Sequence, residues 1–166
     1  MIGNDIIDIV QSRHESNWQR KGFLEKIFTA DEQLLINKAL HPEIIVWSLW
    51  SMKEAAYKIY NRQTKIRSYI PQKLKCSFIF QNDHYISGTV ICCGNNKYYT
   101  ESNISNDCIH TIAVTHPDHL KKVIEIEKKN ISKDQYGIPF LTSTHSHTAQ
   151  AVSVSHHGRF EKVVII

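Results

Sequence analysis

Three charged residues of this chain fall where burial is expected, and their types suit phosphate and metal chemistry. Glu54 and Lys58 are four residues apart within residues 43–62, a segment without glycine or proline that is apolar in nearly every direction at helical spacing. Asp5 falls within residues 2–10, where a strand would place it on an otherwise apolar face. Isolated burial of a charge is costly, so each group needs a partner, a metal ion or a phosphate.

These three residues have a structural and a catalytic interpretation. Taken alone, Glu54 and Lys58 form an ordinary helix salt bridge, and Asp5 is a strand-end carboxylate bonded to backbone amides. If Asp5 and Glu54 converge, the two carboxylates suit Mg²⁺, which takes few protein ligands and completes its octahedron with phosphate oxygens and water. Convergence would therefore indicate phosphoryl transfer.

Other side chains could neutralise and orient the phosphate groups of a substrate. Lys53 and Lys58 lie on the same predicted helix as Glu54 and would balance phosphate charge. Ser155 and His156 stand at a predicted turn, where they could bind a further phosphate oxygen. These residue types are the ones that phosphoryl-transfer sites use.

The sequence patterns around these residues predict helices and strands that would position them. Together they indicate an α+β protein in which an antiparallel sheet packs against helices. Thr29 and Glu32 have the spacing of a capping box, so a helix is expected to begin at Thr29. Asn-Asp, Gly-Asn-Asn and Ser-Asn-Asp turns separate four β-rich runs and indicate a meander. The other helices are expected at residues 43–62 and 118–130, and the strands at 2–10, 73–80, 86–93, 97–104, 108–115, 151–155 and 160–166.

Composition and charge narrow the class of protein. With 166 residues, 42% of them hydrophobic, the chain is expected to fold as one domain, 1–166, with 1–116 and 117–166 as the alternative subdivision. No apolar stretch approaches the ~20 residues of a membrane span, and no basic region precedes the first apolar run, so a cytoplasmic location is expected. The net charge of +4 favours an anionic partner, and the lack of a long basic run makes nucleic acid the weaker candidate.

Two motifs resemble those of the 4'-phosphopantetheinyl transferase superfamily. GNDIIDI at residues 3–9 resembles the family's glycine-x-aspartate strand, and WSMKEAAYK at residues 50–58 resembles its signature helix. FLEKIFTADE at residues 23–32 is similar to the segment between these motifs in holo-acyl-carrier-protein synthases, and AVSVSHHG at residues 151–158 resembles the family's Ser-x-Ser-His turn. Residues 66–130 resemble the family least.

The resemblance implies an activity and a set of site residues. It implies that a serine of an acyl or peptidyl carrier protein attacks the β-phosphorus of coenzyme A, so that 3',5'-ADP leaves. Asp5 and Glu54 would bind Mg²⁺, and Glu54 would also help to deprotonate the serine. Glu54 and Lys58 would thus be the catalytic residues. The residues implied to contact coenzyme A are Lys53, Lys58, Ser155 and His156.

The chain also departs from the family pattern. The larger, surfactin-type members have an acid at the position of Ile7, so water or Asp8 would have to replace that metal ligand. Ile138 stands where the larger class commonly has lysine. The connection between Lys58 and Gly137, about 80 residues long, exceeds that of the smaller class. In the smaller class the sites lie between subunits, so a homo-oligomer is expected, with a site closed within one chain as the alternative.

Several residues and functions keep a second interpretation. His145 and His147 form an HxH pair that suits zinc, or are solvated histidines in a Thr/Ser-rich loop. Arg13, Arg20 and Lys21 form either a docking surface for an acidic carrier protein or a solvated basic face. A non-catalytic relative that binds carrier protein or coenzyme A is the first alternative function. A nucleic-acid-binding module is the second, although it would need aromatic and basic residues interleaved on one sheet face.

Overall fold

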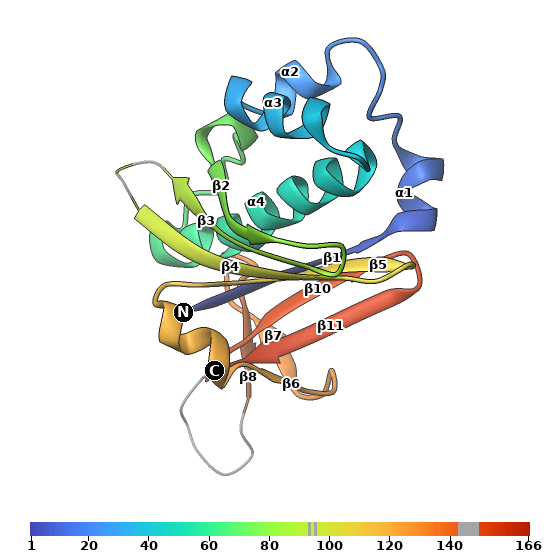
Figure 1. Ribbon diagram of the computed structural model, residues 1–166. Helices are drawn as coiled ribbons and strands as arrows, with labels where there is room; N and C mark the ends of the chain where they lie inside the picture. The colour runs from blue at the N-terminus through green and yellow to red at the C-terminus, as the bar shows by residue number, and fades with distance from the viewer. Residues whose placement is uncertain (93, 95, 143–149) are drawn as a thin grey trace.

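A five-stranded antiparallel sheet forms the centre of the protein, and α4 crosses one of its faces (Figure 1). The computed structural model describes residues 1–92, 94, 96–142 and 150–166. Along the sheet the strands lie in the order β1 (Ile2–Asp8), β5 (Cys108–Val114), β4 (Asn96–Ile104), β3 (Tyr85–Cys92) and β2 (Lys75–Gln81). The α-helices are α1 (Ile9–Glu15), α2 (Phe23–Ile27), α3 (Ala30–Lys38) and α4 (Pro42–Thr64).

The C-terminal part of the chain forms two small antiparallel sheets on the other side of the central sheet from α4, and the first of them packs against β1 (Figure 1). The first has the order β10 (Ser153–His157), β11 (Phe160–Ile165) and β6 (Ile124–Glu125). The second has the order β7 (Ile131–Lys133), β8 (Pro139–Leu141) and β9 (Gln150–Ala151). Since side chains alternate along a strand, β1 presents one set of residues to α4 and the other set to β10.

Glycine permits the close approach of β1 to α4. A Cβ atom at Gly3 would lie 2.0 Å from the carbonyl oxygen of Ala55, which is a fixed backbone atom. Ala55 and Ala56 are fully buried at this contact and add no bulk of their own. The small residues bring Asp5, two positions along the same face of β1, close to the side chains of α4.

Gly3→Ala is expected to lower the free energy of unfolding by at least about 1–3 kcal/mol, because the added methyl group must push β1 and α4 apart. Urea denaturation measures this loss. The control is Asn103→Ala, an exposed position on β4, which should leave the midpoint nearly unchanged. Equal midpoints for the Gly3 variant and the wild type would contradict this account of the packing.

A fully buried ion pair ties α3, α4 and the start of β2 together. Lys53 and Glu32 are 0% exposed, and Lys53 Nζ lies 2.8 Å from Glu32 Oε2. Lys53 also donates to the carbonyl oxygens of Pro71 and Leu74. Glu32 in turn accepts a hydrogen bond from the backbone N–H of Cys76, at 2.7 Å. The charges are tolerated because both groups have several partners.

Most of the predicted elements agree with the structure, and the largest difference lies just after residue 116. The fold class is confirmed, as are the Thr29 capping box, the long helix and the four-strand meander. The first strand ends at Asp8, earlier than expected, because that side chain caps α1. The predicted helix 118–130 is wrong: a 3-10 helix covers only Pro117–Lys122. Leu120 and Val123 pack on a separate apolar cluster, and β6 then pairs with β11.

Two observations bear on the remaining expectations. Within the described part of the chain, no helix has the length and apolar character needed to cross a membrane. The His145 and His147 pair lies outside the described residues.

Candidate active site

The acids predicted to converge, Asp5 and Glu54, line one cavity of about 330 Å³. Lys58 lies beside them, with Nζ 3.5 Å from Asp5 Oδ1. The same ammonium group donates to the carbonyl oxygens of Asn4, at 2.6 Å, and Val154, at 3.3 Å. Lys58 is therefore held between β1 and β10, and its ion-pair partner is Asp5 rather than Glu54.

Burial makes it unfavourable for both acids to be charged at once. It raises the pKa of Asp5, an effect that the nearby Lys58 only partly opposes. It also raises the pKa of Glu54 to about 7, and the negative charge of Asp5 adds to this rise, whereas Lys58 and Tyr69 act in the opposite direction. A cation between the two carboxylates would stabilise the ionised form of each.

The donor set fits Mg²⁺. Asp5 Oδ2 is buried and has no hydrogen-bond partner of ordinary geometry among the described residues. Within the same residues, no third histidine, cysteine or acid joins the pair to complete a ligand cluster. Two carboxylates that leave most positions to phosphate oxygens and water are what Mg²⁺ takes in phosphate-binding sites. Asp5 and Glu54 would hold the ion.

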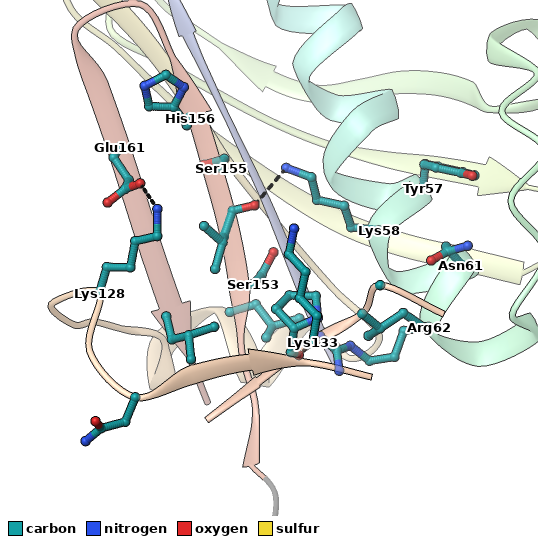
Figure 2. A pocket seen from close by; sticks show the side chains of 17 residues that line it. Tyr57, Lys58, Asn61, Arg62, Lys128, Lys133, Ser153, Ser155, His156 and Glu161 are labelled. Carbon is teal, nitrogen blue, oxygen red and sulfur yellow. Dashed lines mark hydrogen bonds and ion pairs between the residues drawn. The ribbon is translucent and has the colours of Figure 1, made fainter. Parts of the chain in front are cut away.

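A second and larger cavity, of about 880 Å³, lies between α4 and the strands β7, β8 and β10 (Figure 2). Its basic lining residues are Lys58, Arg62, Lys128 and Lys133. One acid on its wall, Glu161, pairs with Lys128. The Arg62 guanidinium donates to the carbonyl oxygens of Pro139 and Val152, at 2.9 and 2.7 Å. The excess of positive charge suits a ligand with several phosphate groups.

Ser155 and His156 are neighbours on the wall of the larger cavity. Ser155 is 5% exposed, lines the larger cavity and accepts a hydrogen bond from Asn4 Nδ2, at 2.9 Å. His156 lines both cavities. A ligand that crosses from the basic cavity towards Asp5 and Glu54 would therefore pass both residues.

Lys53 lies elsewhere. Its ammonium group is buried against Glu32, and Lys53 lines neither cavity. The predicted contact between Lys53 and a pyrophosphate group would require Lys53 to leave this ion pair. The helical position gives a reason, since Lys53 shares a fully buried stripe with Leu49 and Ala56, whereas Glu54 and Lys58 lie on the next stripe.

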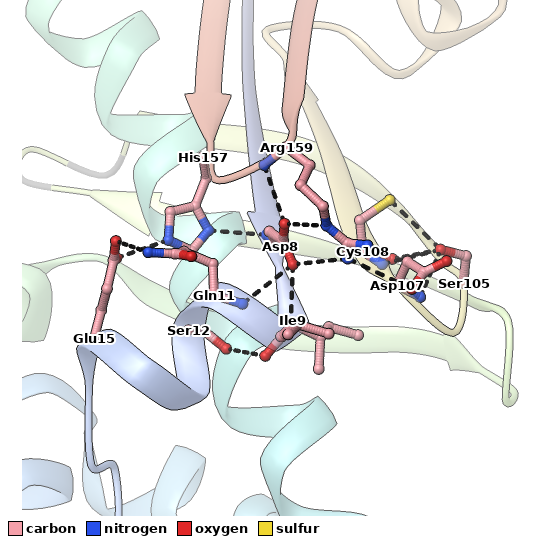
Figure 3. A network of polar contacts seen from close by, with 11 residues as sticks. Asp8, Ile9, Gln11, Ser12, Glu15, Ser105, Asp107, Cys108, His157 and Arg159 are labelled. Carbon is pink, nitrogen blue, oxygen red and sulfur yellow. Dashed lines mark hydrogen bonds and ion pairs between the residues drawn. The ribbon is translucent and has the colours of Figure 1, made fainter.

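Asp8 is not available as a metal ligand. Its side chain faces the C-terminal strands, on the opposite side of β1 from Asp5, and is 1% exposed (Figure 3). Oδ2 accepts hydrogen bonds from Arg159 Nε, at 2.8 Å, and from the Arg159 backbone N–H, while Oδ1 caps α1 through Val10 and Gln11. These contacts favour water over Asp8 as the replacement for the missing third metal ligand.

The Asp8 contacts predict a pH dependence of stability. Hydrogen bonds from Arg159 hold the pKa of Asp8 well below its usual range, so the stabilisation is full above the unfolded pKa of about 4 and is lost as pH falls towards the folded pKa. Asp8→Asn should lower the urea midpoint by the same amount at pH 7 and pH 5, and by less at pH 3. Asp31→Asn, an exposed acid, is the control. A difference in urea midpoint between Asp8→Asn and the wild type that is the same at all three pH values would contradict this account.

Arg62 and Tyr69 were not among the predicted site residues. Arg62 follows Lys58 by four residues, as Lys58 follows Glu54, so the spacing of charges along α4 could have revealed it. Tyr69 comes from the segment after α4; its ring contacts that of Tyr57, with centroids 4.9 Å apart, and it is coupled electrostatically to Glu54. No sequence pattern marks Tyr69.

Comparison with known families identifies the class of protein that this fold and site define. The sequence model of the 4'-phosphopantetheinyl transferase superfamily matches residues 1–114, so the chain belongs to this superfamily. The matched part contains Asp5, Glu54 and Lys58, whereas Ser155 and His156 lie beyond it. A comparison with curated proteins found no similar sequence. Members of the superfamily transfer phosphopantetheine to carrier proteins and generally use Mg²⁺ and coenzyme A.

Proposed function

We propose that the protein transfers 4'-phosphopantetheine from coenzyme A to a serine of an acyl or peptidyl carrier protein and releases 3',5'-ADP. The observation that carries the proposal is a pair of cavities that share the lining residue His156, one with two partly buried acids and one with an excess of basic residues. Lys58 lines the basic cavity and pairs with Asp5, which lines the other cavity, so this ion pair links the two. This arrangement suits a pyrophosphate group bound beside Lys58 and the two acids.

Each group has a role in the transfer. The basic cavity holds the 3'-phosphorylated nucleotide, and Lys58 contacts the pyrophosphate. Glu54 accepts the proton of the carrier serine while the serine oxygen bonds to the β-phosphorus. The bond from that phosphorus to the bridging oxygen then breaks, and 3',5'-ADP leaves with the bond's electron pair. Mg²⁺, when bound by Asp5 and Glu54, supplies positive charge that offsets the charge on the pyrophosphate.

The carrier protein is proposed to dock at the basic residues that follow β1. Arg13 forms three hydrogen bonds to Glu43, of 2.9, 3.1 and 2.7 Å, which neutralises part of this surface. Arg20 lies over the ring of Phe23, and Lys21 is exposed. Arg20 and Lys21 are therefore the two residues best placed to meet acidic side chains of a carrier.

Intact-mass spectrometry tests the proposal directly. An apo carrier protein incubated with this protein, coenzyme A and Mg²⁺ should gain one phosphopantetheine arm. The gain should vanish with EDTA and with a carrier whose acceptor serine is alanine. If several carriers gain no mass while coenzyme A still binds, the protein is a non-catalytic relative. Ile138 would fit that outcome, because its side chain is 5% exposed and carries no charge.

A further inference from the structure

Asn4 contacts three of the elements that build the site. It lies on β1 directly before Asp5 and is 0% exposed. Its carbonyl oxygen accepts from Lys58 on α4, its backbone N–H donates to Ser153 Oγ at 2.8 Å, and its amide nitrogen donates to Ser155 Oγ at 2.9 Å. The amide nitrogen also donates to the carbonyl oxygen of Lys162 on β11, at 3.2 Å.

The Lys162 contact fixes which end of the Asn4 amide carries the nitrogen. A carbonyl oxygen can only accept a hydrogen bond, so the amide group that faces it must be the donor. The two amide hydrogens are then used by Ser155 Oγ and the Lys162 carbonyl oxygen, since His110 Nε2, at 3.4 Å, is more distant. The amide oxygen Oδ1 is buried without a partner among the described residues.

This orientation determines what the two serines can do. Both Ser153 Oγ and Ser155 Oγ accept a hydrogen bond from Asn4, and neither hydroxyl donates to another described residue. A hydroxyl group has one proton to donate. Both serines also line the large basic cavity (Figure 2). Their protons are therefore left for an acceptor in that cavity, and a phosphate oxygen is such an acceptor.

We propose that Asn4 is a positioning residue that orients the hydroxyl groups of Ser153 and Ser155 as donors to a phosphate group of the nucleotide. The inference rests on the proposed function for the identity of the ligand. It goes beyond that function because it assigns a role to a residue on the face of β1 that points away from Asp5 and Glu54.

Binding of 3',5'-ADP, measured by isothermal titration calorimetry without Mg²⁺ or carrier protein, tests the inference apart from catalysis. Asn4→Ala and Ser155→Ala should each weaken binding about fivefold to tenfold, the usual effect of one hydrogen bond. The double variant should be little weaker than either single variant, because both remove the same oriented donor. If the loss of affinity in the double variant equals the product of the two single losses, the inference is overturned.

Asn4→Asp provides the sharper test, because the carboxylate has the shape of the amide but accepts hydrogen bonds. It should draw the Ser155 proton to itself and weaken binding of 3',5'-ADP at least as much as Asn4→Ala does. Unchanged affinity would overturn the inference, and Asn103→Asp on the exposed part of β4 is the matched control. If the Asn4 variants fail to fold, Ser153→Ala and Ser155→Ala each must still weaken binding.

The two proposals fail in different ways. If the wild-type protein binds 3',5'-ADP with the expected dependence on Asn4 but transfers nothing to any carrier, the proposed transferase activity fails and the role of Asn4 stands. If transfer occurs but the Asn4 variants bind 3',5'-ADP as tightly as the wild type, only the role proposed for Asn4 fails. In active protein, the KM for coenzyme A should rise in the Asn4→Ala variant while the dependence on Mg²⁺ concentration stays the same.

Discussion

Glu54→Gln is expected to lower the rate of phosphopantetheine transfer by at least about 100-fold. The amide keeps the shape of the side chain but loses the negative charge and the ability to accept the serine proton. Affinity for 3',5'-ADP without Mg²⁺ should stay close to that of the wild type, because Glu54 does not line the basic cavity. Transfer is followed by intact-mass spectrometry of the carrier under single-turnover conditions.

Glu127→Gln is the matched control for this variant. Glu127 is an exposed acid paired with Lys129, and its loss should leave the transfer rate unchanged. A Glu54→Gln protein that transfers at more than a tenth of the wild-type rate would contradict the assignment of Glu54 to both roles.

The second large effect concerns two lysines five positions apart on α4, and we expect opposite outcomes for them. Lys53→Met should lower the free energy of unfolding by about 3–5 kcal/mol, because it leaves the Glu32 carboxylate buried without its cation. Lys58→Met should cost less stability than Lys53→Met, because the Lys58 side chain is 31% exposed whereas that of Lys53 is fully buried. Its transfer activity should be strongly reduced.

Urea denaturation and transfer assays on the folded fraction separate the two lysines. Folded Lys53→Met protein should retain its affinity for coenzyme A, whereas Lys58→Met should lose most of it. If the Lys53 variant is as stable as the wild type but binds coenzyme A weakly, Lys53 reaches the ligand after all. The placement of Lys53 described above would then be wrong.

Local patterns predicted much of the framework that holds the site. The Thr29 capping box depends on residues three apart, and the long helix depends on an unbroken stretch of helix-forming residues. Both can therefore be predicted from the sequence without knowledge of the tertiary structure. Asp5 and Glu54 could be paired because each is a charge on an apolar face. A charge on an apolar face must have a partner, and the chain has few such charges to pair with one another.

Long-range partners explain what could not be predicted. Lys53 and Glu54 are adjacent charges on a helix that is apolar almost all round, and only the position of Glu32, on another helix, decides that Lys53 turns away from the site. Asn4 is a polar residue without a periodic pattern, and its importance depends on Ser155, about 150 residues along the chain. Asn4 meets these partners only because β10 and β11 pack against β1, and no local sequence pattern predicts that packing.

Side chains alternate along β1, so the residues on both of its faces depend on the same pairing register of this strand. Asp5 faces α4 and the acids, whereas Asn4 and Asp8 face β10 and the turn that follows it. A shift of β1 by one residue would exchange these faces and disable both at once. Under the proposed function, substitutions on one face of β1 would affect nucleotide binding and those on the other face metal binding, whereas an insertion or deletion within Ile2–Asp8 would remove the two together.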